Sequence, residues 1–413
     1  MKSLSRRALS LAAVLTCAAL GAPACGFGGD EDNKDSVSFL APIYTDGENG
    51  TKALWDGIIK DFEAKNPDVD ISLQMESWKT INKTVQDKIQ SGSAPDILNI
   101  DAYASYVKPE QLIYEAKDVV SEGVLLDFQP DFARNASIDG KQYGLPIFAS
   151  TRTLFYNQEL FDKAGITAPP KTWDELLADA KKINDLGGVS GYGLPLGSEE
   201  AQGETSIWTF GAGGSWGDDQ TLTIDTPANV EGVTAMQRMI DEKATQPNPG
   251  ATDRKDVINA FIQGKVGMIE GLPPTVAQLA KENPGLKYGT APTPSKTGVP
   301  VTLGVADHLM SFKNDPAKQE KVRKFLDYFY SPDVYAKFVQ TEGFIPTTIS
   351  GAEKLAGDPV TKTFVATLPT AKFYPSNNPK WGAAQGALQQ LAGTIDQGAS
   401  PAEVLTKVAN AAK

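Results

Sequence analysis

The sequence contains one histidine, His308, and only two cysteines, Cys17 and Cys25, in 413 residues. This scarcity almost excludes a catalytic set of the Ser-His-Asp or Cys-His type and a metal site built from histidine and cysteine. The glycine-rich run 211–217 does not fit the spacing of dinucleotide-binding or phosphate-binding loops. The acidic run 30–35 lacks the glycine and the distant glutamate of an EF-hand loop. We therefore expect no metal and no cofactor.

Basic residues are also in the minority, since 39 lysines and arginines face 51 aspartates and glutamates, for a formal net charge of −12. Such an acidic chain is not expected to bind nucleic acid or anionic lipid through a basic surface. The N-terminus differs from this pattern, because Lys2, Arg6 and Arg7 precede the apolar run 8–20, which is short for a membrane span. We therefore interpret residues 1–24 as a signal peptide, of either the Sec or the twin-arginine type, that exports the protein.

The signal peptide ends in Ala22-Pro23-Ala24-Cys25, which resembles a bacterial lipobox although Ala22 stands where leucine is usual. Simple cleavage after an Ala-x-Ala site is the alternative, and both readings cut before Cys25. Cleavage removes Cys17 and leaves a single thiol in an exported chain, so no internal disulfide can form. We therefore predict that Cys25 is a lipid anchor, that residues 25–35 are a tether, and that the protein sits on the outer face of the cytoplasmic membrane.

The remaining chain is too long for one ordinary core, and two domains are expected. Its first part alternates between apolar strand patterns and helix patterns, at 36–41, 54–62, 69–73, 78–90 and 95–100. This order predicts a parallel sheet, in which ligands bind beyond the carboxyl ends of the strands. The loops at that edge carry Asp46, Glu48, Trp78 and Asp101.

The second part of the chain repeats the mixture of strands and helices. Asp139-Gly140 is a tight-turn pair, and Thr172 with Glu175 forms a capping box that starts a helix at Trp173. Another helix is expected from Pro227. We also expect a glycine-rich segment at 208–219 and strands at 143–148, 154–156, 221–225, 266–269 and 301–305.

The most specific pattern runs from Asp139 to Leu177. It contains Tyr143-Gly144-Leu145-Pro146, a short polar link, Leu154-Phe155-Tyr156-Asn157, and Pro169-Pro170-Lys171-Thr172-Trp173-Asp174-Glu175-Leu176. This order closely resembles the family 1 extracellular solute-binding proteins of ABC importers, which include maltose-binding and glycerol-phosphate-binding proteins. The resemblance covers essentially the whole mature chain. It implies an α/β fold of two lobes, each a sheet flanked by helices, joined by hinge crossings.

By the same resemblance each lobe is discontinuous in sequence. Residues 36–149 and 305–350 are expected to form the N-terminal lobe, and residues 150–304 and 351–413 the C-terminal lobe. The protein would be a monomer that captures a sugar by closure of the lobes and delivers it to the membrane permease, without being an enzyme.

A sugar needs aromatic rings for its C–H faces and polar side chains for its hydroxyls. Trp381 follows the Pro- and Asn-rich run 374–380, which resembles the maltose-binding segment whose tryptophan stacks on the sugar; core packing is the alternative. Asp101 matches a carboxylate that binds hydroxyls in the family, or caps a helix. Ser150 and Arg152 lie in the crossing, where they contact ligand or make hinge hydrogen bonds. The remaining candidates are Trp216, Glu270 and Asp307.

Leu272-Pro273-Pro274 stands where the family often has a tryptophan, which favours a monosaccharide or short oligosaccharide as ligand. Three other functions stay open. One is the binding of a non-sugar solute such as a glycerol phosphate derivative. Another is a secreted glycoside hydrolase, which would need two facing carboxylates from among Asp101, Glu270 and Asp307. The third is a surface adhesin or sensor with the same lobes but no transport.

Overall fold

The computed structural model describes residues 36–45, 47–48, 50–108 and 110–413. The predicted signal peptide 1–24, the tether 25–35 with Cys25, and Asp46 lie outside these residues. Among the helices that the structure describes, none has the length and apolar character needed to cross a membrane.

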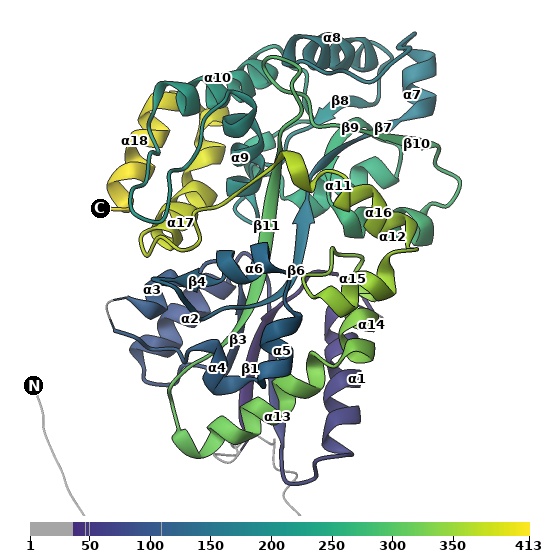
Figure 1. The fold of residues 1–413 in the computed structure, drawn as a ribbon. Coiled ribbons are helices and arrows are strands. Elements are labelled where there is room, and N and C mark those ends of the chain that lie inside the picture. The colour runs from purple at the N-terminus through teal and green to yellow at the C-terminus, as the bar shows by residue number, and fades with distance from the viewer. Residues whose placement is uncertain (1–35, 46, 49, 109) are drawn as a thin grey trace, which may run out of the picture. The chain divides into compact units, whose positions relative to one another are not determined.

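The first sheet of the described chain has six strands in the order β12-β11-β3-β1-β2, with β6 also paired to β11 (Figure 1). These strands are β1 (Val37–Pro42), β2 (Ile71–Glu76), β3 (Ile97–Ile100), β6 (Leu145–Thr151), β11 (Thr302–Ser311) and β12 (Ala371–Phe373). β1 pairs in parallel with both β2 and β3, which confirms the parallel sheet predicted from the first part of the chain. β11 runs antiparallel to β3 and β6.

The helices that cover this sheet turn apolar faces toward it. In α1 (Thr51–Glu63) the buried residues Trp55, Ile58, Ile59 and Phe62 recur at helical spacing, as the sequence pattern predicted. The other helices of this region are α2 (Ile81–Gln90), α3 (Ala104–Val107), α4 (Ala116–Val119), α5 (Glu122–Asp127), α6 (Pro130–Asn135), α13 (Gln319–Phe329), α14 (Pro332–Glu342) and α15 (Ile349–Leu355). Between α6 and β6, the strands β4 (Ser137–Ile138) and β5 (Lys141–Gln142) form a hairpin whose turn residues Asp139 and Gly140 both have positive φ, as the Asp-Gly pair predicted.

A second sheet has four strands in the order β10-β7-β9-β8 within the described residues. Its strands are β7 (Thr153–Asn157), β8 (Ser190–Gly193), β9 (Val266–Gly271) and β10 (Tyr288–Ala291). The helices around it are α7 (Gln158–Lys163), α8 (Trp173–Asn184), α9 (Ala201–Gly211), α10 (Pro227–Asp241), α11 (Arg254–Ile262), α12 (Pro273–Glu282), α16 (Pro359–Val365), α17 (Trp381–Leu391) and α18 (Pro401–Ala411). The predicted capping box at the start of α8 is confirmed, with Thr172 and Glu175 each bonding the backbone of the other.

The chain passes from the first sheet to the second at Arg152. Thr151 is the last residue of β6 and pairs with Gly304, whereas Thr153 opens β7 and pairs with Gly271. A buried guanidinium therefore lies at the junction of the two sheets. The predicted lobe boundaries at 149/150, 304/305 and 350/351 stay a prediction.

Two predicted features of the second part are wrong. Residues 221–225 form no strand, since their only β-type pairing among the described residues is an isolated bridge between Gly217 and Leu222. Trp208 lies inside α9 and not in a glycine-rich loop. Every residue of α9 is buried, so the helix has no polar stripe by which an amphipathic pattern could reveal it.

Candidate functional site

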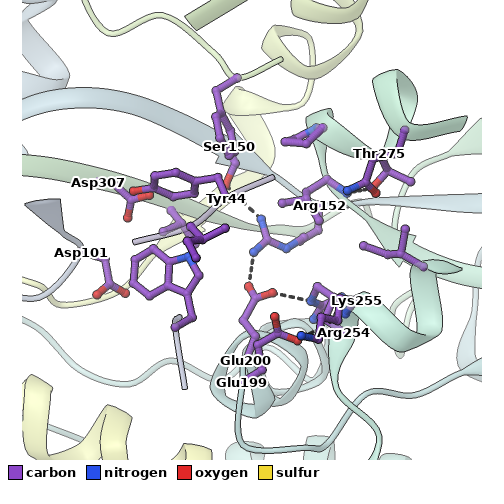
Figure 2. Close-up of a pocket in the computed structure, with 18 of the residues that line it drawn as sticks. Tyr44, Asp101, Ser150, Arg152, Glu199, Glu200, Arg254, Lys255, Thr275 and Asp307 are labelled. Carbon is purple, nitrogen blue, oxygen red and sulfur yellow. Dashed lines mark hydrogen bonds and ion pairs between the residues drawn. The ribbon is translucent and has the colours of Figure 1, made fainter. Parts of the chain in front are cut away.

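A pocket lies beyond the carboxyl end of β3, with side chains contributed by the surroundings of both sheets (Figure 2). Its empty volume of about 910 Å³, part of which is open to solvent, is of the size that small-molecule ligands occupy. Its lining includes the four aromatic residues Tyr44, Trp78, Phe344 and Tyr374, together with the aliphatic residues Ile43, Ile258, Leu272, Pro274 and Val305. The Tyr44 ring packs edge-on against Trp78 and Phe344, with centroids 5.7 and 5.3 Å apart, which fixes this wall.

Arginine side chains from the crossing and from α11 meet at one end of the pocket (Figure 2). Arg152 donates from Nη1 to Ser150 Oγ at 3.0 Å and forms an ion pair through Nη2 with Glu200. Arg254 binds the same carboxylate, with Nε 2.5 Å from Glu200 Oε2, and reaches Glu204 Oε2 with Nη2 at 3.1 Å. Burial alone would raise the pKa of Glu200, but the two guanidinium groups hold that pKa below its usual value. Both arginines are therefore already neutralised by carboxylates.

Asp101 and Asp307 lie at the other end of the pocket, away from the arginines in Figure 2. Both side chains are buried, with 4% and 6% of their surface exposed. Asp101 follows β3 directly, and its Oδ2 accepts a hydrogen bond of 2.7 Å from Gln385 Nε2 in α17. Burial raises the pKa of Asp101 to about 6, and burial followed by the charge of Asp101 raises that of Asp307 well above its usual value.

Several pocket side chains have buried polar atoms without a hydrogen-bond partner in the described part of the chain. Such atoms are rare in folded proteins, because an unpaired buried polar group costs free energy. Four of them are oxygens that accept, Asp101 Oδ1, Asp307 Oδ1, Gln202 Oε1 and Gln278 Oε1, and the two aspartates are acceptors only when they are ionised. Arg152 Nε donates, and the Tyr374 hydroxyl can do either. The pocket therefore offers more free acceptors than free donors.

The structure brings together half of the residues that the sequence proposed as ligand contacts. The ones that line the pocket are Trp78, Asp101, Ser150, Arg152 and Asp307. Glu48 is exposed and does not line it, and Asp46 lies outside the described residues. That any of these side chains touches a ligand stays a prediction.

Three further candidates are buried outside the pocket lining. Glu270 accepts a hydrogen bond of 2.9 Å from Thr293 Oγ1, and burial, with the neighbouring charge of Glu204, raises its pKa to about 8. Trp216 donates from Nε1 to Ser206 Oγ at 2.7 Å. Trp381 is fully buried in the same core, with its ring 5.0 Å from that of Tyr374. The structure therefore places the Trp381 side chain in the core, which was the alternative to ligand contact.

His308 also lies outside the pocket lining. It is fully buried, its ring meets Tyr103 edge-on at 5.1 Å, and burial lowers its pKa to about 3. The imidazole is therefore neutral at ordinary pH. The described residues contain no group of three or more histidine, cysteine, aspartate or glutamate side chains placed to hold a metal ion.

Sequence reasoning missed several residues that define the pocket, namely Tyr44, Glu199, Glu200, Arg254, Gln278 and Tyr374. Glu199 and Glu200 precede the fully buried helix α9, whose sequence pattern did not indicate a helix or a binding site. Arg254 looks like an ordinary charged residue at the start of α11. The one available signal was Tyr44, which lies two residues after the end of β1 and so occupies the edge where ligands bind in parallel sheets.

Comparison with known proteins places the chain among binding proteins. The family model for bacterial extracellular solute-binding protein matches residues 46–336. A binding protein of Brucella abortus (strain 2308) is 36% identical over 334 residues, covering 79% of this chain and 80% of that protein. The diacetylchitobiose binding protein DasA of Streptomyces coelicolor is 25% identical over 410 residues, 93% of each chain.

A solved structure is similar over nearly the whole described chain. It is a sugar transporter from Arthrobacter chlorophenolicus A6 with bound laminaribiose, which superposes with a TM-score of 0.80 at 20% identity and covers 91% of this chain and 98% of that one. This likeness shows the shared fold, a two-lobed α/β architecture with sheets flanked by helices.

Proposed function

The chain belongs to the bacterial extracellular solute-binding proteins, and we propose that it is the receptor of an ABC importer that binds a monosaccharide or short oligosaccharide in the pocket of Figure 2. In this proposal Trp78 and Tyr44 pack on the sugar ring, and Asp101, Ser150, Arg152 and Asp307 meet its hydroxyl groups. The family consists of substrate-binding receptors, and the proposed function is capture without catalysis.

The observation that carries the proposal is the set of unpartnered polar atoms inside an aromatic-walled pocket. A pyranose presents apolar C–H faces to aromatic rings and a ring of hydroxyl donors to acceptors. The free oxygens of Asp101, Asp307, Gln202 and Gln278 are acceptors that such hydroxyls would satisfy. Relatives support the same class, because DasA is named for a disaccharide ligand.

The arginines argue against a phosphorylated ligand such as a glycerol phosphate derivative. A phosphate needs free guanidinium or ammonium donors, but Arg152 and Arg254 already share Glu200, and Arg254 also binds Glu204, which leaves Lys255 as the remaining cation of the pocket lining. The carboxylates likewise argue against a glycoside hydrolase. Glu270 is engaged by Thr293 outside the pocket lining, while Asp101 and Asp307 lie at the same end of the pocket and not on opposite sides of the space that a glycosidic bond would occupy.

Lobe closure is the proposed mechanism of capture. Asp101 and Asp307 belong to the first sheet region and Glu200, Arg254 and Gln278 to the second, so one ligand in the pocket would touch both. A ligand that bridges both lobes only when they are shut stabilises the closed state by its differential affinity. The permease would then bind the closed form.

The remaining parts of the proposal concern export and anchoring. We propose that the protein acts as a monomer on the outer face of the cytoplasmic membrane, held by lipid on Cys25 with residues 25–35 as tether. The extracellular family and the signal-like N-terminus support export. A single acyl chain binds a protein to a membrane only marginally, whereas a lipidated cysteine that carries two or more acyl chains anchors it stably.

A thermal-unfolding screen of neutral and amino monosaccharides and disaccharides tests the proposed function. A ligand present at a hundredfold excess over its dissociation constant adds about 2.7 kcal/mol to the unfolding free energy, and each kcal/mol raises the midpoint of a domain of this size by about 2–4 °C. A shift of several degrees with at least one sugar is expected. No shift with sugars and a clear shift with amino acids, polyamines or glycerol phosphodiesters would refute the carbohydrate assignment.

A further inference from the structure

Asp101 and Asp307 come from neighbouring strands of the first sheet. Asp101 follows β3, and Asp307 lies in β11, which is antiparallel to β3 with His308 opposite Ile100. The register of β11 against β6 shifts between Asp307 and His308. Figure 2 shows both carboxyl groups at the same end of the pocket, with Tyr44 beside them.

Neither carboxylate has a cation as partner. In the described residues no lysine or arginine forms an ion pair with either, and Arg152, the nearest guanidinium by its effect on Asp307, is already held by Ser150 and Glu200. Asp101 Oδ2 has the Gln385 amide, but Asp101 Oδ1 and Asp307 Oδ1 have no partner and both side chains line the pocket. Two buried like charges this close are unfavourable unless a proton or a cation joins them.

The groups around the pair do not supply that cation. The Tyr44 hydroxyl lies 3.0 Å from Asn99 Oδ1 and is also a hydrogen-bond partner of Asp307. Burial first, and then the charge of Asp307 and the hydrogen bond with it, raise the pKa of Tyr44 well above its usual value, so it stays neutral. The next charge, Glu200, is negative and raises the pKa of both aspartates further. No third acidic or histidine ligand completes a metal site in the described chain. In the empty protein a retained proton can relieve the repulsion, and a cationic ligand is the group that would replace it.

We propose that Asp101 and Asp307 form a subsite for the protonated amino group of an amino sugar. An ammonium group has three donors and one positive charge, so it can donate to both unpartnered oxygens and let both carboxylates ionise. A neutral hydroxyl has one donor and leaves the pair with uncompensated charge or a retained proton. This inference rests on the proposed carbohydrate-binding function and names the sugar class that the pocket selects.

Calorimetric titration of the mature protein at pH 7 with sugars of equal length tests the inference. The amino sugars are glucosamine and chitobiose, and their neutral counterparts are glucose, cellobiose and diacetylchitobiose. The expected result is at least tenfold tighter binding of an amino sugar than of its neutral counterparts. Equal or weaker binding of the amino sugar overturns the subsite but leaves the proposed carbohydrate function standing. Binding of no sugar at all overturns both.

Asparagine variants show whether the carboxylate pair causes the preference. Asp307→Asn keeps the size of the side chain and removes one charge. It should therefore weaken amino-sugar binding at least tenfold more than it weakens binding of the neutral sugar, whose hydroxyl group can still bond the asparagine amide. Asp101→Asn should do the same. Equal loss for both sugar classes would make the aspartates general hydroxyl contacts and overturn the inference.

The matched control is Asp179→Asn, which changes a buried aspartate of α8 that pairs with Lys182 at 2.9 Å and does not line the pocket. It should alter neither affinity. A melting curve of each variant shows that the fold is intact, and removing one of two repelling charges is not expected to lower stability.

Discussion

Replacing Trp381 by alanine separates a core tryptophan from a ligand platform. The Trp381 side chain is fully buried, its ring lies 5.0 Å from Tyr374 and 6.3 Å from Trp216, and it belongs to the core that α9, α10, α17 and α18 share. Removing a buried tryptophan leaves a cavity and costs about 3–5 kcal/mol of unfolding free energy. At about 2–4 °C per kcal/mol, the melting midpoint of Trp381→Ala should fall by roughly 6–20 °C.

Trp78→Ala is the matched comparison, because Trp78 is half-buried and lines the pocket. Loss of a stacking surface there should cost about 1.5–3 kcal/mol of binding free energy, which is tenfold or more in affinity, with little change in the melting midpoint. Urea denaturation and calorimetric titration of both variants give the two free energies. A Trp381→Ala protein of unchanged stability that no longer binds sugar would refute the assignment of Trp381 to the core.

Three further predictions concern charge and anchoring. Arg152→Met removes one of the two cations that bind the buried Glu200 carboxylate. Urea denaturation should show a loss of unfolding free energy near the lower end of the about 3–5 kcal/mol typical of a broken buried pair. Adding Glu200→Gln should recover part of that loss, and no recovery would contradict the pairing. The folded-state pKa of Glu270 is raised from 4.5 to about 8, so the stability that its protonated form contributes is lost as pH rises through that window. Glu270→Gln cannot lose that proton and should therefore lose less stability than the unmodified protein between pH 5 and pH 9. Parallel curves of stability against pH for the two proteins would count against a buried neutral Glu270. Cys25→Ser should release the protein from the membrane fraction, and an unmutated protein found entirely in the soluble secreted fraction would exclude the anchor.

Local rules predicted the elements whose signals are contained within a few residues. The capping box at Thr172 and Glu175, the Asp139-Gly140 turn and the apolar face of α1 were all correct, because each depends on side chains close together in sequence. The strand β8 was missed, since Ser190-Gly191-Tyr192-Gly193 has little β propensity and is held by its neighbour β9.

The candidate site was harder to predict, because its parts are far apart in the chain. Glu200 is a site residue only because the fold brings it into contact with Arg152 and Arg254, and the spacing of these residues in the sequence does not predict those ion pairs. For Trp381 the sequence left ligand contact and core packing open. The Pro- and Asn-rich run before it is largely buried, and α17 begins at Trp381 with its indole in the core, which no local pattern could decide.

Unpaired buried atoms do not all carry the same meaning, and their surroundings distinguish them. Trp55 Nε1 and Trp381 Nε1 are isolated donors within apolar clusters, and the His308 nitrogens belong to a neutral, buried ring packed against Tyr103, so their cost is part of core packing. The free oxygens of Asp101 and Asp307 instead converge on one cavity, are both negative when ionised, and lower the stability of the empty protein. These unpaired oxygens destabilise the free receptor, and a ligand that donates hydrogen bonds to them removes that cost. The free energy regained on binding strengthens the complex, so such a cost at the end of a pocket fits a binding site.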